Sequence, residues 1–220
     1  MGGLALAVLS FVGSHELLSH PLRRPLVARL GEKGFLLLYS LVAFATFAWI
    51  VVEFRAAPDN LLWVAPDWVW TAGAVIMLAA SILFVGSLTA PNPAMTGAAG
   101  VLARDPDPQG VLCITRHPMM WSFALWALVH AAVSGRAAVL ILAIGIGGLA
   151  LFGATMQDRK KAALHGERWA AWRAKTSFIP FTRLNCWPGW IAVVGGIILF
   201  LVATWAHPRL GAPLIGFWRL

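Results

Sequence analysis

The chain has 220 residues, of which 60% are hydrophobic and only 12% are charged, and its mean hydropathy is +0.77. A composition this apolar excludes an ordinary soluble domain and indicates an integral membrane protein. The formal net charge of +8 does not indicate a nucleic-acid-binding protein, because the basic residues cluster between hydrophobic runs, as they do in membrane proteins.

Six apolar runs follow one another along the chain, at residues 3–19, 34–52, 68–90, 118–133, 137–156 and 188–206. At about 1.5 Å per residue, a helix of each length can cross a hydrocarbon core of about 30 Å, the shortest ones only just. Because irregular backbone cannot face lipid, we expect the runs to be helices. The predicted fold is all-α, a polytopic bundle of about six transmembrane helices that forms a single domain over residues 1–220.

Basic residues are distributed unevenly between alternate loops. Thirteen lysines and arginines, with Arg183 the last of them, lie on one side of the predicted spans, and four lie on the other: Arg55, Arg136, Arg209 and Arg219. By the positive-inside rule, the thirteen are expected in the cytoplasm and both termini outside it. The first run has no basic segment before it, so it is expected to be a span and not a cleavable signal.

The charged linker at residues 157–183 has the pattern of a basic amphipathic helix. Trp169 and Trp172 lie among its basic residues at helical spacing, and Pro180 is expected to end the helix. The sequence therefore predicts an interfacial segment that anchors to the membrane surface through these tryptophans.

The two cysteines, Cys113 and Cys186, are far apart in the sequence and form no CxxC or CxxCH pattern. They argue against a disulfide framework, a zinc site and covalently attached c-type haem. We expect two ordinary thiols near the membrane boundary.

Two histidines fall inside predicted spans: His15, next to Glu16, in the first run and His130 in the fourth. An ionisable side chain within the membrane is costly unless it is paired or bound, so each is a candidate functional residue. Imidazoles on two helices among aromatic residues suit the axial ligands of a non-covalent b-type haem. Proton relays and interhelical hydrogen bonds use histidine pairs as well. His165 and His207 are expected to be solvated or to cap a helix.

Arginines at the inner boundary are candidate partners for haem propionates: Arg23, Arg24 and Arg116. Arg116 and His117 come directly before Pro118, which suits the first turn of a helix, so both are expected at the membrane boundary. There they could hold an anionic group such as a propionate, a phosphate or a carboxylate.

Depth within the membrane does not favour a pairing of His15 with His130. Counted from the inner ends of their spans, the two residues differ in depth by about 12 Å, and His117 is nearer the level of His15. On the same helix, Trp121 and Trp126 are candidates to line a pocket for a flat or polyene ligand, although ordinary packing explains them equally well.

Three segments carry a family resemblance: GSHELLSHPLRRPL, ITRHPMMWSFALWALVHAAVSG and DRKKAALHGERWAAWRAKTSFIPF. With the run that begins GEKGFLLLYS, they resemble the NnrU family of membrane proteins, which includes a plant carotene isomerase. The resemblance implies a polytopic protein that binds haem b. In the plant enzyme two histidines ligate the iron, and the reduced haem promotes a cis-to-trans isomerisation.

Motif by motif, the ligating histidines correspond to His15 and His130, and this is why His130 ranks above His117. A further histidine of the plant enzyme, implicated in ligand switching, falls here at about Glu53 or Phe54. Bacterial members are associated with denitrification and nitric oxide metabolism, so the resemblance implies the inner membrane of a bacterium. The implied partners are membrane lipid and a hydrophobic polyene such as a carotenoid.

Two alternative functions remain open. The RHP start of the fourth run and the later GERWAAWR stretch are also similar to membrane methyltransferases of the isoprenylcysteine carboxyl and phospholipid types, where they help form the S-adenosylmethionine site. Those enzymes usually carry two adjacent glutamates before the second motif, where this chain reads MQDRKK. The other alternative is a haem protein that responds to redox state or nitric oxide without turning over a substrate.

Overall fold

The computed structural model describes residues 1–94, 99–104, 107–182 and 186–211, and this part of the chain is helical apart from loops and one isolated bridge between Leu61 and Arg136. The all-α prediction is confirmed. Arg183 and Arg219, which entered the loop count above, lie outside the described residues.

Five helical segments among the described residues are long and apolar enough to cross a membrane: Gly2–Ser19 (α1), Arg23–Ala56 (α2), Asp67–Thr89 (α3), Ala137–His165 (α6) and Trp190–Arg209, which is Trp190–Ala206 (α8) with part of the 3-10 turn that follows it. The fourth predicted run is Pro118–Ser134 (α5), an apolar helix of 17 residues that is shorter than these five spans, since the last of them counts the turn after α8. The sixth crossing therefore stays a prediction that depends on α5. Helix α2 begins well before its predicted span and has non-helical backbone at Gly31.

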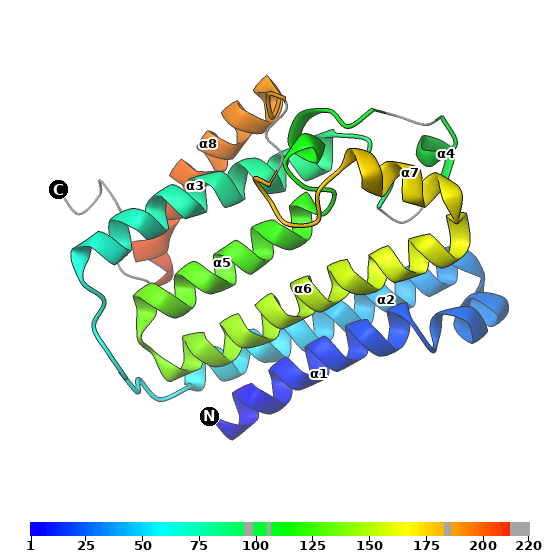
Figure 1. Ribbon diagram of the computed structural model, residues 1–220. Coiled ribbons are helices and arrows are strands. Elements are labelled where there is room, and N and C mark those ends of the chain that lie inside the picture. The colour runs from blue at the N-terminus through cyan, green and yellow to red at the C-terminus, as the bar shows by residue number, and fades with distance from the viewer. Residues whose placement is uncertain (95–98, 105–106, 183–185, 212–220) are drawn as a thin grey trace.

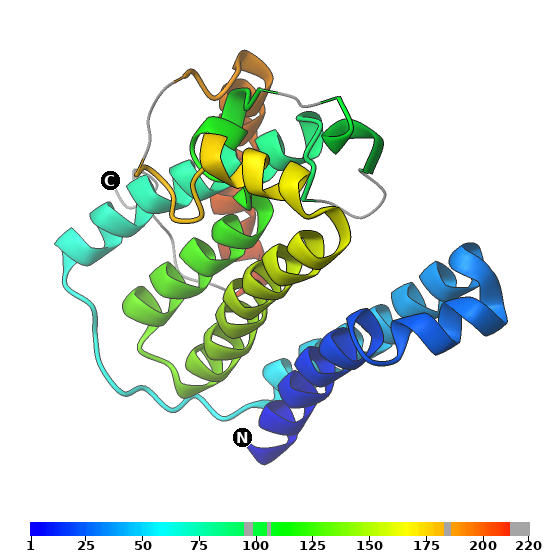
Figure 2. The same ribbon diagram turned by 45° about the vertical axis from the view of Figure 1, so that its right-hand side comes forward.

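The helices pack in the spatial order α2, α1, α6, α5, α3, α8, so α6 lies between α1 and α5 (Figure 1). Figure 2 shows the α1–α2 hairpin standing apart from the rest of the bundle along much of its length. Small residues allow close contacts between helices, as is usual in membranes. A Cβ on Gly196 of α8 would lie 2.6 Å from the Cα of Ile82 in α3, and one on Gly145 of α6 would lie 2.2 Å from a methyl of Val8 in α1.

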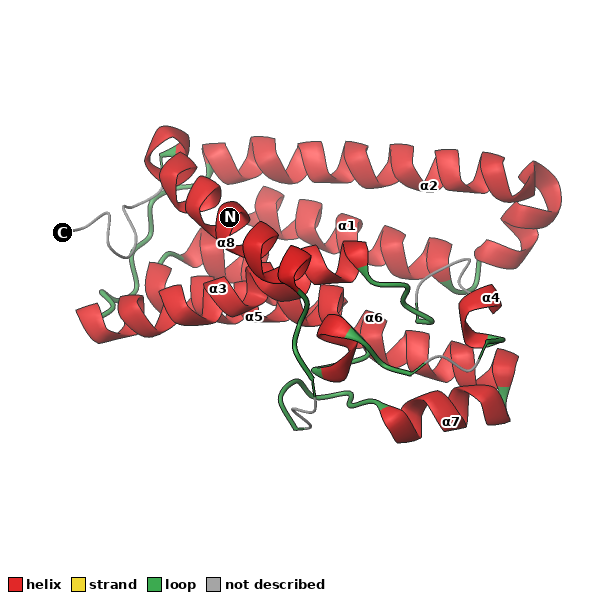
Figure 3. Ribbon diagram, turned by 90° about the horizontal axis from the view of Figure 1, so that it is seen from above, coloured by secondary structure: helices red, strands yellow, loops and turns green. Residues whose placement is uncertain are grey.

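The end of the bundle at which α1 ends and α5 and α8 begin is here called the basic end, because most described lysines and arginines lie there. Three short helices cover part of it: Ala99–Leu102 (α4), Gly110–Cys113 (η1) and Glu167–Lys175 (α7). Seen from above, α7 lies on the far side of α6 from α2, and α4, which contacts α7, lies near the same end of α6 (Figure 3).

Helix α7 confirms the expected helix within residues 157–183, but its tryptophans are not at the surface. Trp169 and Trp172 are 0% and 2% exposed, and they pack against apolar residues of the loop before α5: Ala94, Leu102 and Leu112. The expected membrane contact through these rings is therefore wrong, because the loop folds over α7 and buries both indoles within the protein.

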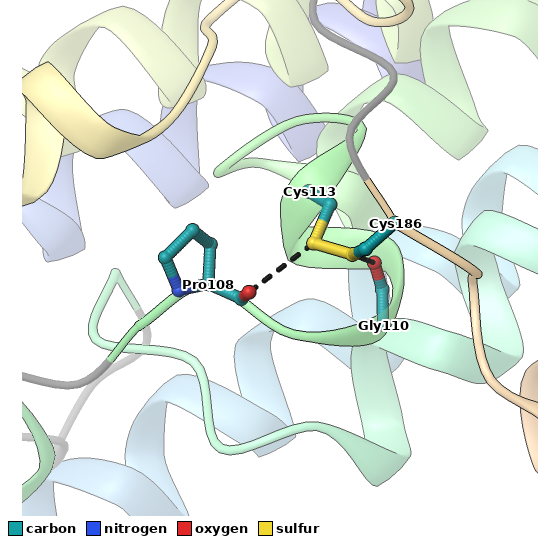
Figure 4. The surroundings of a disulfide bond; sticks show 4 residues. All are labelled: Pro108, Gly110, Cys113 and Cys186. Atoms are coloured by element: carbon teal, nitrogen blue, oxygen red, sulfur yellow. Dashed lines mark hydrogen bonds between the residues drawn. A yellow bond between two sulfur atoms is a disulfide. The ribbon is translucent and has the colours of Figure 1, made fainter.

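A disulfide joins Cys113 of η1 to Cys186, which lies just before α8 (Figure 4). The expectation of two ordinary thiols is therefore wrong. The two cysteines are 73 residues apart in the sequence, so their pairing could not be predicted. They meet because η1 packs beside the segment that leads into α8. The sulfur of Cys113 also lies 3.2 Å from the carbonyl oxygen of Pro108.

Candidate functional site

A buried ionic cluster lies at the basic end, where α5 begins. Both carboxylate oxygens of Asp158, near the end of α6, lie 3.0 Å from Arg116 Nε, and one of them also accepts a hydrogen bond from an Arg116 terminal nitrogen. His117 Nε2 lies 2.7 Å from the other oxygen. Arg116 and His117 are 5% and 2% exposed. The Arg116 guanidinium and His117 Nε2 are thus directed at Asp158, whereas His117 Nδ1 is buried without a hydrogen-bond partner among the described residues.

The cluster is joined to the segment that follows α7 through residues 177 and 178. Thr115 and Trp121 both donate to the carbonyl oxygen of Phe178, at 2.8 and 2.7 Å, and the Arg116 amide donates to the Ser177 carbonyl at 2.8 Å. The Phe178 ring in turn lies 5.3 Å from the Arg116 guanidinium carbon. Trp121 therefore joins two segments of the chain, and it lines none of the three cavities described here.

His15 lines a cavity of about 570 Å³ between the α1–α2 hairpin, α5 and α6. Its Nδ1 lies 2.8 Å from the carbonyl oxygen of Phe11, one turn earlier, and its ring is 5.3 Å from that of Tyr39. Glu16 and His20 line the same cavity, with 3.2 Å between a Glu16 oxygen and His20 Nε2. The cavity combines an aromatic interior with a polar rim toward the basic end.

The arginines expected to bind propionates contribute little free charge to this cavity. Arg23 lines it, but its guanidinium is already paired with the carboxylate of Glu32, at 3.0 and 3.1 Å, and lies over the ring of Phe35. Arg24 is exposed and lines none of the cavities described here. Their role toward a cofactor stays a prediction.

His130 lines a different cavity, of about 500 Å³, between α3, α5 and α8. Its Nδ1 lies 2.8 Å from the carbonyl oxygen of Trp126, whose indole stacks on the imidazole with 4.2 Å between ring centres. The ring of His207, at the end of α8, lies 6.2 Å from that of His130, with an angle of 25° between the planes. Two imidazoles and an indole thus share one largely apolar cavity.

The structure does not bring His15 and His130 together. On α6 the His130 cavity uses Val139 and Leu142, whereas the His15 cavity uses residues from Ile146 to Lys160. The two sections of α6 do not overlap, in agreement with the depth difference estimated from the sequence. Helix α6 lies between α1 and α5 (Figure 1), and His15 and His130 line different cavities.

These positions allow a test of whether haem b fits the residues present. None of the three cavities described here contains both His15 and His130, so haem b held by this pair of histidines stays a prediction. His130 and His207, by contrast, do line one cavity.

Sequence reasoning missed two residues here, Asp158 and His207. Asp158 was taken as part of a charged linker. No sequence pattern predicts that it pairs with His117, because the two residues are 41 positions apart. His207 was expected to be solvated or to cap a helix. Its position could have indicated that it lies near His130, because both residues come at the ends of apolar runs that finish on the same predicted side of the membrane.

Comparison with known proteins gives a consistent family assignment. The family model described as "NnrU protein" matches residues 3–214. A stretch of 75 residues, 34% of this chain, is 32% identical to the chloroplastic 15-cis-zeta-carotene isomerase of Zea mays and, at the same length, 35% identical to that of Arabidopsis thaliana. The match spans only 20% of the length of each plant protein. No solved structure matches the chain.

Proposed function

Because the chain belongs to the NnrU family of membrane proteins, we propose that it binds a hydrophobic polyene and isomerises one of its cis double bonds in the His130 cavity. The proposal is supported by the similarity to two plant proteins named as carotene isomerases. The single observation that carries it is a largely apolar cavity between α3, α5 and α8, within the length of the helices, with aromatic and imidazole rings on its wall.

The wall of this cavity suits a hydrocarbon chain. The hydroxyls of Ser81 and Thr204 donate to carbonyl oxygens of their own helices, at 2.9 and 2.8 Å. With those hydroxyls satisfied, the surface offered to a ligand is mainly apolar and aromatic, including Trp126 and Phe200. An extended conjugated chain buries its surface favourably against such a wall and needs no hydrogen bonds.

Isomerisation adds no atoms and transfers no net electrons, so the protein must hold the polyene and allow one double bond to weaken for a moment. Haem b would be held by His130, and when bound it supplies a redox-active iron beside the cavity. Trp126 orients the imidazole by stacking on it, and its carbonyl oxygen fixes the Nδ1 proton. The apolar wall keeps water away from the conjugated chain.

Product analysis tests this proposal. The purified protein, reconstituted in lipid vesicles with haem, is incubated with 15-cis-ζ-carotene in the presence and absence of dithionite, and the isomers are separated by chromatography. We expect conversion to the trans isomer under reducing conditions and its loss in His130→Ala. Conversion equal to that of protein-free vesicles contradicts the proposal.

Binding measurements on the same purified protein separate the alternatives. Haem binding without conversion supports the haem protein that responds to redox state or nitric oxide. Binding of S-adenosylmethionine by a colourless protein supports the methyltransferase, although the RHP residues Arg116 and His117 are occupied by Asp158. The link to denitrification and the cytoplasmic location of the basic end stay predictions.

A further inference from the structure

A second cavity, of about 380 Å³, adjoins the His130 cavity at the end of the bundle opposite the basic end. It lies between α2, α6 and the loop that follows α2, and is here called the α2–α6 cavity. Apolar side chains of α2 line it, among them Phe47, Ile50 and Val51. Two of its polar residues, Asp59 and Arg136, are paired with each other, and their side chains are 66% and 46% exposed. The α2–α6 cavity is therefore an apolar space with water-facing charges at its rim.

The two cavities share part of their walls. Five residues line both of them: Phe54, Arg136, Val139, Leu142 and Gly211. Val139 and Leu142 are three positions apart on α6, so they lie on one face of that helix. Phe54 and Leu142 both pack against the buried cluster formed by α1, α2 and α6. The shared residues thus mark the junction of the two cavities, and Phe54 is the aromatic side chain among them.

The length of the His130 cavity limits the chain that it can cover alone. Its lining residues on α3 run from Trp70 to Ser81, about 17 Å along the helix axis. An extended carotene is longer than this, and its conjugated double bonds make it too stiff to fold back on itself. The α2–α6 cavity adds lining residues from Phe47 to Arg55, about 12 Å along α2. The second cavity therefore offers apolar contact to the part of a long chain that the first cannot cover.

We propose that a long polyene occupies both cavities, with its reacting part beside His130 and one end in the α2–α6 cavity, and that Phe54 controls which chains extend through the junction. This inference rests on the proposed function for the class of ligand. It gives the site a preference for long polyenes over short ones, because only a long chain gains the apolar contact of both walls.

Protection of a thiol in the second cavity tests the inference without an activity measurement. Ala57→Cys places the thiol in the wall of the α2–α6 cavity, and Ala56→Cys, the matched control, places one at a neighbouring position that lines none of the three cavities. Each full-length variant, purified in detergent, is treated with a maleimide in the presence of 15-cis-ζ-carotene or of farnesene, a short hydrocarbon of the same isoprenoid type. Neither reductant nor dithionite is added, and wild-type protein gives the background from Cys113 and Cys186.

The expected result depends on chain length. At about ten times its dissociation constant, ζ-carotene should slow the labelling of Ala57→Cys about tenfold. Farnesene, which is short enough to stay in the His130 cavity, should leave that rate unchanged. Neither hydrocarbon should slow the labelling of Ala56→Cys.

Variants of the junction test the role of Phe54. Phe54→Trp fills the junction and should weaken the binding of ζ-carotene, measured as carotene retained per protein after gel filtration, by about tenfold, because the chain loses one apolar wall. Farnesene binding should persist and show that the variant is folded. Val139→Phe narrows the junction from α6 and should have the same effect, which guards against misfolding of the first variant. Phe44→Trp, at a position of α2 that is 74% exposed and lines none of the three cavities, should bind both hydrocarbons as the wild type does.

The outcomes separate the inference from the proposed function. If ζ-carotene binds but does not slow the labelling of Ala57→Cys, or slows that of Ala56→Cys equally, the two-cavity site is overturned and the isomerase proposal still stands. Equal protection by farnesene overturns the preference for long chains, and unchanged ζ-carotene binding in both Phe54→Trp and Val139→Phe overturns the role of Phe54. Protection of Ala57→Cys by a carotene that dithionite never causes to be converted supports the two-cavity site while the isomerase proposal fails. A protein that retains no polyene overturns both.

Discussion

At the basic end Asp158 is enclosed between Arg116 and His117, whereas at the opposite end Asp59 meets Arg136 in an exposed pair 3.0 Å apart. The Asp158 side chain is 13% exposed and that of Asp59 is 66% exposed. Charges removed from water are costly to leave unpaired, while charges in water contribute little. The basic end is therefore the firmly joined end, and the His130 cavity lies at the end with weaker ties.

The largest difference in the free energy of unfolding is expected between variants of Asp158 and Asp59. Asp158→Ala leaves the buried Arg116 without its carboxylate and should lower the free energy of unfolding by about 3–5 kcal/mol. Asp59→Ala, the matched variant at the other end, should cost less than about 1 kcal/mol. Thermal unfolding of both variants in detergent measures the difference. Equal small losses would show that the Asp158 cluster does not hold the basic end together.

The disulfide is expected to have the next largest effect. Replacing both Cys113 and Cys186 by serine should lower the free energy of unfolding by about 2–4 kcal/mol, because the link closes a long loop. Wild-type protein unfolded with dithiothreitol is the matched measurement, and it should fall to the stability of the double variant. Maleimide labelling of wild-type protein without reductant contradicts the disulfide if both thiols react.

The same labelling also tests the orientation predicted from the basic residues. The cytosol keeps thiols reduced, whereas the disulfide lies at the end predicted to face it. Labelling of intact cells with a maleimide that does not cross membranes, compared with labelling after lysis and after reduction, shows on which side Cys186 lies and whether it is oxidised there.

A smaller contrast is expected between two helix contacts. Gly196→Ala places a methyl against the backbone of α3 at Ile82, which cannot move aside, and should destabilise the protein by about 1–3 kcal/mol and disturb the His130 cavity. Gly145→Ala meets a methyl of the Val8 side chain, which can rotate, so it should cost less. Unfolding measurements on both variants decide the order, and the reverse order contradicts the packing described for α3 and α8.

The smallest effects are expected from two indole hydrogen bonds. Trp121→Phe removes the bond to the Phe178 carbonyl at 2.7 Å and should cost about 1 kcal/mol. Trp63→Phe removes a bond to the Ala132 carbonyl at 3.1 Å on the exposed opposite end, where water replaces the lost partner, and should cost only a few tenths of a kcal/mol. Equal costs in chemical denaturation would remove this distinction between the ends.

The helices could be predicted from the sequence because apolar length is a local property. The fourth and fifth runs begin at the residues predicted, Pro118 and Ala137, and the third differs by one residue at each end. Extensions into polar sequence were missed: α6 continues to His165 and α2 begins at Arg23. Hydropathy locates the part of a helix that is embedded in lipid. It does not indicate where helical hydrogen bonding ends outside the membrane.

The pairing of distant residues could not be predicted in the same way. Asp158 with Arg116, and Cys113 with Cys186, depend on how the loops fold over the basic end, which no local pattern encodes. His207 was passed over because a histidine before proline at a helix end has ordinary explanations. The depth calculation from the sequence agrees with the separate cavities that His15 and His130 line, while their joint role as haem ligands, taken from the family resemblance, stays a prediction.

The disulfide gives the chain an unusual tolerance to cleavage. Helices α5, α6 and α7 all lie between Cys113 and Cys186, so they belong to one covalently closed ring. A protease that cuts once anywhere within this ring leaves two fragments that remain bonded. Such a nicked molecule would migrate as an intact chain on a gel without reductant, and only a reducing gel would reveal the cut.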